Sequence, residues 1–317
     1  MKKSKLCLSL IATILLLLIV TSCKSEVTPP DVDPIGPYLT FSSDESFTIN
    51  VPGTFKGSDN CKLEYSTDTL HWSERKNTVD TAIEAAKNTD GKYYLYFKGT
   101  GITSMGYNSF KHWVLSGNNV RCTGNIETLL DYKTVGNGGH PPMKSYCFSY
   151  TFSNNKALIS APVLGATTLT EYCYMEIFCD CSNLKELPDN MLPADTLEKY
   201  CYTYMFSNCT SLITARELPA STLASGCYSY VFTSCTALTT APELKAQRLE
   251  DTCYKQMFKN CNQLSSMTCL ATDLTALAST DAWVEGVKAD GTFTKATSSD
   301  WPRDINGIPA NWTVNNI

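Results

Sequence analysis

The pattern of hydrophobic and polar positions changes twice along the chain. After a largely apolar run at residues 8–20, residues 38–135 alternate in places, as at Phe47, Ile49 and Val51, and residues 93–97 form an aromatic-rich run. Alternation with a period of two is typical of half-buried strands. We therefore expect an antiparallel β-sandwich over residues 38–137, with a helical turn at residues 82–87.

From residue 147 onward, cysteine and phenylalanine recur in register. A first cysteine column comprises Cys147, Cys173, Cys201, Cys227 and Cys253. A phenylalanine column follows five residues later at Phe152, Phe178, Phe206, Phe232 and Phe258. A second cysteine column lies eight residues after the first at Cys181, Cys209, Cys235 and Cys261, with Asn155 in the opening position. The spacing is 26 residues except in the second repeat, where two extra residues fall within 189–192. This period predicts a solenoid, in which each unit covers the apolar face of its neighbour.

Each unit combines two kinds of predicted element. Cys227, Phe232 and Cys235 are separated by offsets that fall on one face of a short helix. The extended segment that follows should be short, because prolines such as Pro188 and Pro242 cannot donate to a strand ladder. We therefore expect an α/β fold, with a short solenoid over residues 138–272, preceded by the sandwich-like domain and followed by a small C-terminal capping module at residues 273–317. Its three tryptophans should close the end of the solenoid rather than form a sugar-stacking platform.

The repeat resembles the BspA-like leucine-rich repeats of bacterial surface proteins. The form CYxxMFxxCxxLxxAPEL, present with variations at residues 201–218, 227–244 and 253–264, is similar to repeats in Bacteroidota surface lipoproteins. Departures from the pattern include Asn155 in the cysteine column, Arg216 in place of a proline and Lys245 in the turn. The resemblance implies a leucine-rich-repeat solenoid with a ligand-binding or adhesive role at the cell surface, and no reaction.

The first residues predict a lipid anchor. Three lysines precede the apolar run, which is too short to span a membrane comfortably, so residues 1–22 are typical of a signal peptide. The sequence Val-Thr-Ser-Cys that ends at Cys23 resembles a bacterial lipobox, which implies lipidation of Cys23. Residues 23–37 carry four prolines and are typical of an extended spacer. We expect an outer membrane lipoprotein that is exposed at the surface, with the periplasmic face as the alternative.

Composition excludes several classes of function. The formal net charge is −5, and residues 1–23 contain three lysines and no acid, so the remainder carries −8. Nucleic acid is therefore not expected as a partner. Only three histidines occur, and no pair has the spacing of a metal site or a catalytic triad. We expect no catalytic residues, no metal and no cofactor.

The fifteen cysteines leave three alternatives open. Buried thiol columns are favoured, because cysteine is often a small apolar core residue. Disulfides between adjacent turns and metal sites are the other two alternatives, although Cys179-Asp180-Cys181 is too short and isolated for a zinc site.

The tyrosines provide the candidate binding stripe, since aromatic rings bind with little loss of rotamer entropy. Half-buried rings that only contribute to packing are the alternative. The stripe comprises Tyr150, Tyr174, Tyr202, Tyr204, Tyr228, Tyr230 and Tyr254. Three Asp-Thr-aliphatic sequences resemble acceptors of Bacteroidota O-glycosylation, at Thr69, Thr81 and Thr196.

These features predict a non-catalytic cell-envelope lipoprotein that mediates adhesion or macromolecular binding. Its partners would be the membrane, through the N-terminal lipid, and a host or microbial protein or glycan. The alternative is a glycan-capture module of a polysaccharide-uptake system. An enzyme that uses carboxylates is disfavoured, because Glu186, Glu217 and Glu243 recur in the manner of solvated turns.

Overall fold

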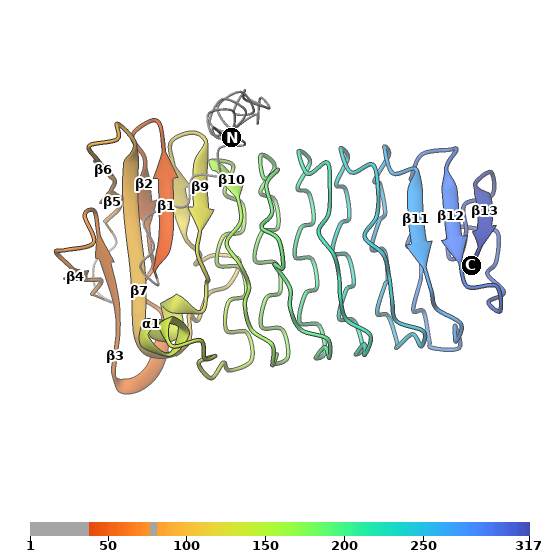
Figure 1. Cartoon of the computed structure of the whole chain (residues 1–317), viewed down its shortest axis with the longest axis horizontal. Coiled ribbons are helices and arrows are strands. Elements are labelled where there is room, and N and C mark those ends of the chain that lie inside the picture. The colour runs from red at the N-terminus through yellow and green to blue at the C-terminus, as the bar shows by residue number, and fades with distance from the viewer. Residues whose placement is uncertain (1–37, 77–80) are drawn as a thin grey trace, which may run out of the picture. The chain divides into compact units, whose positions relative to one another are not determined.

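The computed structural model describes residues 38–76 and 81–317, which belong to one compact unit. These residues form a β-rich fold with three sheets and one helix. Figure 1 shows the long N-terminal strands at one end of this unit and β11, β12 and β13 at the other, with the chain between them running in side-by-side passes. The predicted signal peptide, Cys23 and the spacer lie outside the described residues.

The largest sheet has the strand order β10-β9-β1-β7-β3-β4, with β6 paired to β7. Its strands are β1 (Leu39–Ser43), β3 (Lys56–Ser66), β4 (Ser73–Glu74), β6 (Ala86–Lys87), β7 (Tyr93–Ser104), β9 (Val120–Thr123) and β10 (Leu158–Ser160). All pairs are antiparallel except β9 with β10. Because β10 lies within the first repeat, this sheet continues from the N-terminal strands into the repeats.

Two smaller sheets and the helix complete the described elements. One sheet is antiparallel, with β2 (Thr48–Asn50) between β5 (Ile83–Glu84) and β8 (Val114–Ser116). The other is parallel and has the order β11 (Ser266–Cys269), β12 (Thr292–Lys295), β13 (Thr313–Asn316). The helix α1 (Thr128–Gly136) lies against β7, where Gly99 permits the approach: a Cβ there would be 1.7 Å from the Leu129 carbonyl oxygen.

Alternate backbone N–H groups in the repeats point to different partners. The N–H groups of Tyr228 and Tyr230 donate to carbonyls of the next repeat, at 3.0 and 2.8 Å. The N–H groups of Ser229 and Val231 donate to carbonyls three residues earlier in their own repeat. Every fourth residue has a left-handed backbone, for example Tyr230 with φ 59°. Consecutive repeats are thus joined by backbone hydrogen bonds, and each segment is a series of four-residue turns.

The expected α/β fold with a leucine-rich-repeat solenoid is wrong. The described residues are β-rich, none of the three sheets is closed or solenoid-like, and α1 is the one helix among them. No helix forms at residues 227–235, because half of the N–H groups there are bonded to the next repeat and not to their own segment. The separate antiparallel sandwich is also wrong, since β9 pairs with β10 in parallel. The helical turn expected at residues 82–87 contains β5 and β6.

The phenylalanine column fills the interior of the repeats. Its five rings are buried and stacked, with centroids of neighbouring rings 5.7 Å apart at each of the four steps. Stacking at every step keeps apolar faces away from water along the whole set of repeats. One connected cluster of buried residues joins these rings to the strands at both ends.

Asn155, which takes the first position of the second cysteine column, connects the first repeat to β8. Its side-chain amide accepts from the Leu115 N–H at 2.7 Å and donates to the carbonyls of Trp113 and Phe152 at 2.7 and 3.0 Å. A cysteine could not make these three bonds. Asparagine therefore replaces cysteine at the position where the first repeat contacts β8, a strand of an antiparallel sheet.

Tryptophans cover both ends of the aromatic columns. Trp113 packs on Phe152 with centroids 5.6 Å apart, and Trp283 packs on Tyr254 with centroids 6.1 Å apart. Trp283, Trp301 and Trp312 are all buried, so their rings offer no platform for a sugar. Trp301 in turn stacks on Trp283, with ring centroids 5.2 Å apart.

Candidate functional site

The turn pattern divides the tyrosines of the repeats into surface and core positions. With a period of four residues, positions with a left-handed backbone lie at outward corners, and the positions midway between them point inward. Two corner columns carry tyrosines. We call Tyr146, Tyr172 and Tyr200 the first-corner tyrosines, and Tyr150, Tyr204 and Tyr230 the second-corner tyrosines; together they form the tyrosine surface.

Four residues of the expected binding stripe lie in the core. Tyr174, Tyr202, Tyr228 and Tyr254 are 0–2% exposed, and their rings stack from repeat to repeat. Burial raises the pKa of each phenol well above its usual value. These four rings cannot contact a partner at the surface, because position i+2 of each turn points inward.

The other three residues of the stripe, which are the second-corner tyrosines, reach the surface. All three are partly buried. The Tyr150 hydroxyl donates to Glu176 Oε1 at 3.0 Å, and the Tyr204 and Tyr230 rings stack with centroids 4.3 Å apart. Desolvation, together with the neighbouring Glu176, raises the pKa of Tyr150 to about 12. The phenol therefore stays protonated and remains a hydrogen-bond donor at neutral pH.

The sequence-based prediction missed the first-corner tyrosines. Tyr146 is 46% exposed, and the centroids of the stacked rings are 4.5 Å apart from Tyr146 to Tyr172 and 4.9 Å from Tyr172 to Tyr200. The Tyr200 ring continues over Gly226, where a Cβ would come within 2.2 Å of the ring. The hydroxyl of Tyr146 also contributes to the raised pKa of Tyr150, so the two corner columns are neighbours.

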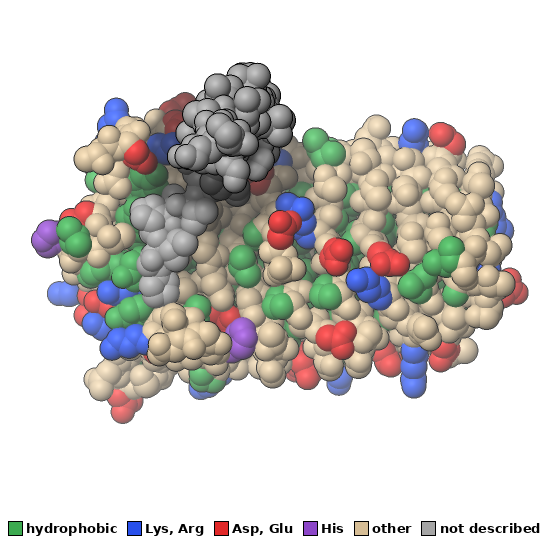
Figure 2. All heavy atoms as spheres, viewed as in Figure 1, with side chains coloured by type: hydrophobic (Ala, Val, Ile, Leu, Met, Phe, Trp, Pro, Cys, Tyr) green, Lys and Arg blue, Asp and Glu red, His purple; other side chains and the backbone are tan. Residues whose placement is uncertain are grey.

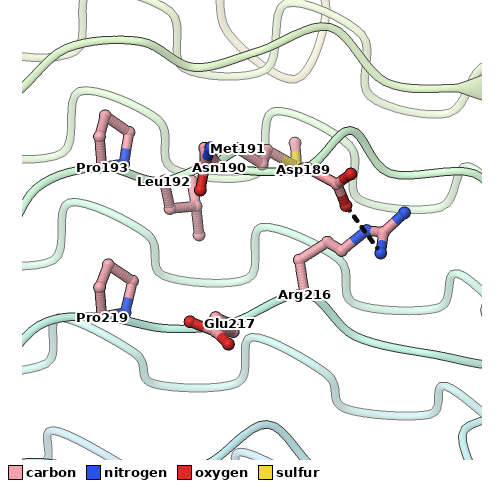
Figure 3. Close-up of a pocket in the computed structure, with 8 residues that line it drawn as sticks. All are labelled: Asp189, Asn190, Met191, Leu192, Pro193, Arg216, Glu217 and Pro219. Carbon is pink, nitrogen blue, oxygen red and sulfur yellow. Dashed lines mark ion pairs between the residues drawn. The ribbon is translucent and has the colours of Figure 1, made fainter.

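A pocket lies between the two-residue insertion at residues 189–192 and Arg216, which replaces a proline of the repeat pattern. It has a volume of about 540 Å³ and lies between the two-residue insertion and the segment that follows the next repeat's phenylalanine. Figure 3 shows Pro193 and Pro219 on one side of the pocket and the Asp189–Arg216 ion pair on the other. Arg216, which replaces a proline, donates from Nε to the Leu187 carbonyl at 2.8 Å and pairs through Nη1 with Asp189 at 3.0 Å.

Further ion pairs join neighbouring segments of the chain. Arg121 of β9 pairs with Glu186, and Glu217, which lines the pocket, lies 3.7 Å from the Lys245 ammonium of the next repeat. Figure 2 shows acidic and basic side chains side by side in the middle of one face of the repeats. Glu186, Asp189 and Glu217 are each paired with a basic side chain.

The cysteines of the described region are free thiols, and all but Cys61 are buried. In the second cysteine column, each Sγ donates to the carbonyl of a phenylalanine in the preceding repeat, as from Cys235 to Phe206 at 3.1 Å. Burial raises the pKa of Cys181 and Cys261 to about 12. Disulfides between adjacent turns, one of the alternatives, do not occur among these residues.

Histidine, cysteine and acidic side chains do not gather into metal-binding groups among the described residues. No group of three or more histidine, cysteine or acidic side chains there could hold a metal ion. His71 pairs with Asp68 at 2.7 Å, and His140 pairs with Glu127 at 2.9 Å. Within the same residues, no helix has the length and apolar character to cross a membrane.

The candidate glycosylation residues differ in accessibility. Thr81 and Thr196 are exposed. Thr69 is partly buried, has a left-handed backbone with φ 63°, and donates from its hydroxyl to the Asp68 carbonyl at 2.6 Å. The lipidation candidate Cys23 lies outside the described residues.

Comparisons with known proteins give no family or relative. No family model matches the chain, and no curated protein or solved structure matches it. The candidate sites therefore rest on the geometry of this chain alone.

Proposed function

We propose that this protein is a non-catalytic lipoprotein of the bacterial cell envelope that binds a macromolecule through its tyrosine surface. The observation that carries the proposal is the stack of partly exposed rings at Tyr146, Tyr172 and Tyr200, at the corners of three consecutive repeats. The resemblance of the repeats to BspA-like surface proteins supports the same function.

Stacked corner tyrosines suit binding for two reasons. Each ring is held by its neighbour before a partner arrives, so little side-chain entropy is lost on contact. Their spacing of 4.5–4.9 Å is close to the distance between neighbouring β-strands, so the rings form a continuous amphipathic strip. A strip of this kind favours a partner with a repeating or extended surface, such as a polypeptide segment or a linear glycan.

The thiols support the absence of catalysis. A nucleophilic cysteine needs a depressed pKa and access to solvent. Burial instead raises the pKa of Cys173 and Cys227 to about 12, which leaves their sulfurs protonated and enclosed. Hydrolysis that depended on Glu186, Glu217 or Glu243 would contradict the proposal.

The lipid anchor is proposed from the sequence around Cys23. Two or three acyl chains on this residue would hold the protein at a membrane stably, whereas one chain would not. Labelling with an alkyne fatty acid should modify the wild-type protein but not the Cys23→Ala variant, and label retained on the variant would refute the anchor. Protease treatment of intact cells distinguishes surface exposure, which gives cleavage, from a periplasmic location, which gives protection.

The binding function is tested with purified mucin and serum proteins on one surface and a glycan array on another. We expect the wild-type protein to bind at least one of them, and the Tyr172→Ala/Tyr200→Ala variant to lose most of that binding. Phe110→Ala is the matched control, because Phe110 is a 92% exposed aromatic residue outside the tyrosine surface. Equal loss in the control, or full binding by the double variant, would refute a role for the tyrosine surface.

A further inference from the structure

The pocket beside Arg216 is produced by two changes that compensate each other. The two-residue insertion contains Asp189 and Asn190, which line the pocket, and Arg216, which replaces a proline, supplies the side chain that pairs with Asp189. Arg216 is fixed by Leu187 on one side and by Asp189 on the other. A guanidinium with two nitrogens already partnered is held in place, and the Arg216 side chain is still 47% exposed, so it can donate further hydrogen bonds.

The polar groups of the pocket offer both donors and acceptors. Asp189 and Glu217 have side chains that are 85% and 84% exposed, so their carboxylate oxygens can accept hydrogen bonds from a ligand. The Asn190 amide and Arg216 can donate. With Lys245 close to Glu217, two carboxylates are balanced by two cations. This balance disfavours both a phosphate-like anion and a strongly cationic ligand.

The remaining wall is apolar. Met191 and Leu192 are buried by the core and contribute the base of the pocket, while Pro193 and Pro219 form one side (Figure 3). A volume of about 540 Å³ is in the range of small-molecule sites. A ligand that fits this pocket would therefore carry donor and acceptor groups on one side and an apolar face on the other.

We propose that this pocket binds a neutral saccharide unit. The hydroxyl groups donate to Asp189 and Glu217 and accept from Arg216 and Asn190, and the C–H face of the sugar ring lies on the two prolines. No residue that lines the pocket belongs to the first-corner or second-corner tyrosines, so the site goes beyond the proposed function. If an experiment refutes binding at one of the two sites, the proposal for the other site is unaffected.

The experiment uses four uncharged probes: methyl β-glucoside, methyl β-galactoside, methyl α-mannoside and N-acetylglucosamine. Each is titrated into the protein and followed by saturation-transfer NMR and calorimetry. We expect at least one to bind with a Kd of about 1 mM or below. Glu217→Gln and Asp189→Asn should each weaken that binding about tenfold or more, because each removes a charged acceptor with little change of shape.

Arg248→Ala is the matched control. Arg248 is also an exposed arginine paired with a nearby acid, Glu250, but it does not line the pocket. Its removal should leave the Kd unchanged, and thermal melts should show that all variants are folded. Because Glu217→Gln removes no contact shorter than 3.7 Å within the protein, its fold should survive even if a change at Arg216 would not.

Four results would overturn the proposal. The first is that none of the four probes binds, and the second is that both pocket variants bind with wild-type affinity. The third is that the charged analogues methyl glucuronide or glucosamine bind more tightly than the neutral sugars. The fourth is that binding is lost in Tyr172→Ala/Tyr200→Ala and kept in the pocket variants. The last result would place the saccharide on the tyrosine surface.

Discussion

At the scale of single residues, two positions along the chain separate a surface tyrosine from a core tyrosine. Tyr172 has φ 57° and lies at a corner with its ring partly exposed, whereas Tyr174 is fully buried. The difference comes from the four-residue turn and not from the side chains, which are identical. Residue type alone therefore could not assign these tyrosines to binding or to packing.

The core tyrosines carry hydroxyls that packing does not satisfy. The Oη atoms of Tyr202 and Tyr228 are buried without a hydrogen-bond partner. Leaving a buried hydroxyl unpaired costs about 1–3 kcal/mol, so Tyr202→Phe should raise the free energy of unfolding by about 1 kcal/mol. Urea unfolding measures this change. Tyr150→Phe is the control and should lower stability slightly, since its hydroxyl bonds to Glu176; a clear loss of stability in Tyr202→Phe would show that its hydroxyl is paired.

Asn155 tests the connection between the repeats and β8. Asn155→Ala would leave the Leu115 N–H and the Trp113 carbonyl buried without their partner. We expect a loss of about 2–4 kcal/mol in the free energy of unfolding, measured by urea melts. Asn155→Cys, which restores the column but not these bonds, should lose a comparable amount; wild-type stability in this variant would refute the connecting role.

At the scale of elements, the sequence predicts that the cysteine and phenylalanine columns are buried but not the backbone that buries them. Offsets of five and eight residues place Phe232 and Cys235 with Cys227 on one helical face, and four-residue turns bury the same three residues. Because both backbones satisfy the pattern, the choice depends on N–H partners 25 or more residues away, which a local pattern cannot reveal. One residue in the column that begins with Tyr146 did indicate a left-handed corner in the sequence. It is Gly226, whose φ is 64°, a value that glycine adopts readily.

The same limit explains the two missed features of the surface. A left-handed tyrosine is uncommon, so no local rule predicts Tyr172 or Tyr200 at a corner. The insertion at residues 189–192 and the departure at Arg216 were both visible in the sequence. Their meeting in one pocket could be seen only after the repeats were paired.

The phenylalanine column should carry much of the stability of the repeats. Phe206→Ala or Phe232→Ala should lower the free energy of unfolding by about 3–5 kcal/mol, because the cavity lies between two stacked neighbours. Tyr204→Ala, which removes one partly exposed ring from a stacked pair, should cost about 1 kcal/mol. Urea melts of the whole chain compare them, and an inverted order would place the tyrosines in the core.

At the scale of the whole molecule, buried thiols and phenols link stability to pH. Burial raises the pKa of Cys173, Cys227 and Cys269 from 9.0 to about 12. Above about pH 9 the unfolded chain loses these protons while the folded protein keeps them, so stability is full below about pH 9 and falls as the pH rises toward 12.

Each such thiol should contribute a slope of up to about 1.4 kcal/mol per pH unit. The melting temperature should therefore fall steeply from about pH 9 to about pH 11, and less steeply in a Cys227→Ala/Cys269→Ala variant. A melting temperature that is unchanged across this range would show that the thiols are accessible or already bonded.

The central claim is that corner tyrosines bind and core tyrosines pack. Hydroxyl-radical footprinting with mass spectrometry tests it most directly, because oxidation reports the exposure of each ring in the free and bound protein. We predict that Tyr146, Tyr172 and Tyr200 react in the free protein and are protected by the bound macromolecule, that Tyr174 and Tyr202 are unreactive in both, and that Phe110 reacts equally in both. Rapid oxidation of Tyr174 and Tyr202, or protection of Phe110 without protection of the first-corner tyrosines, would contradict the account.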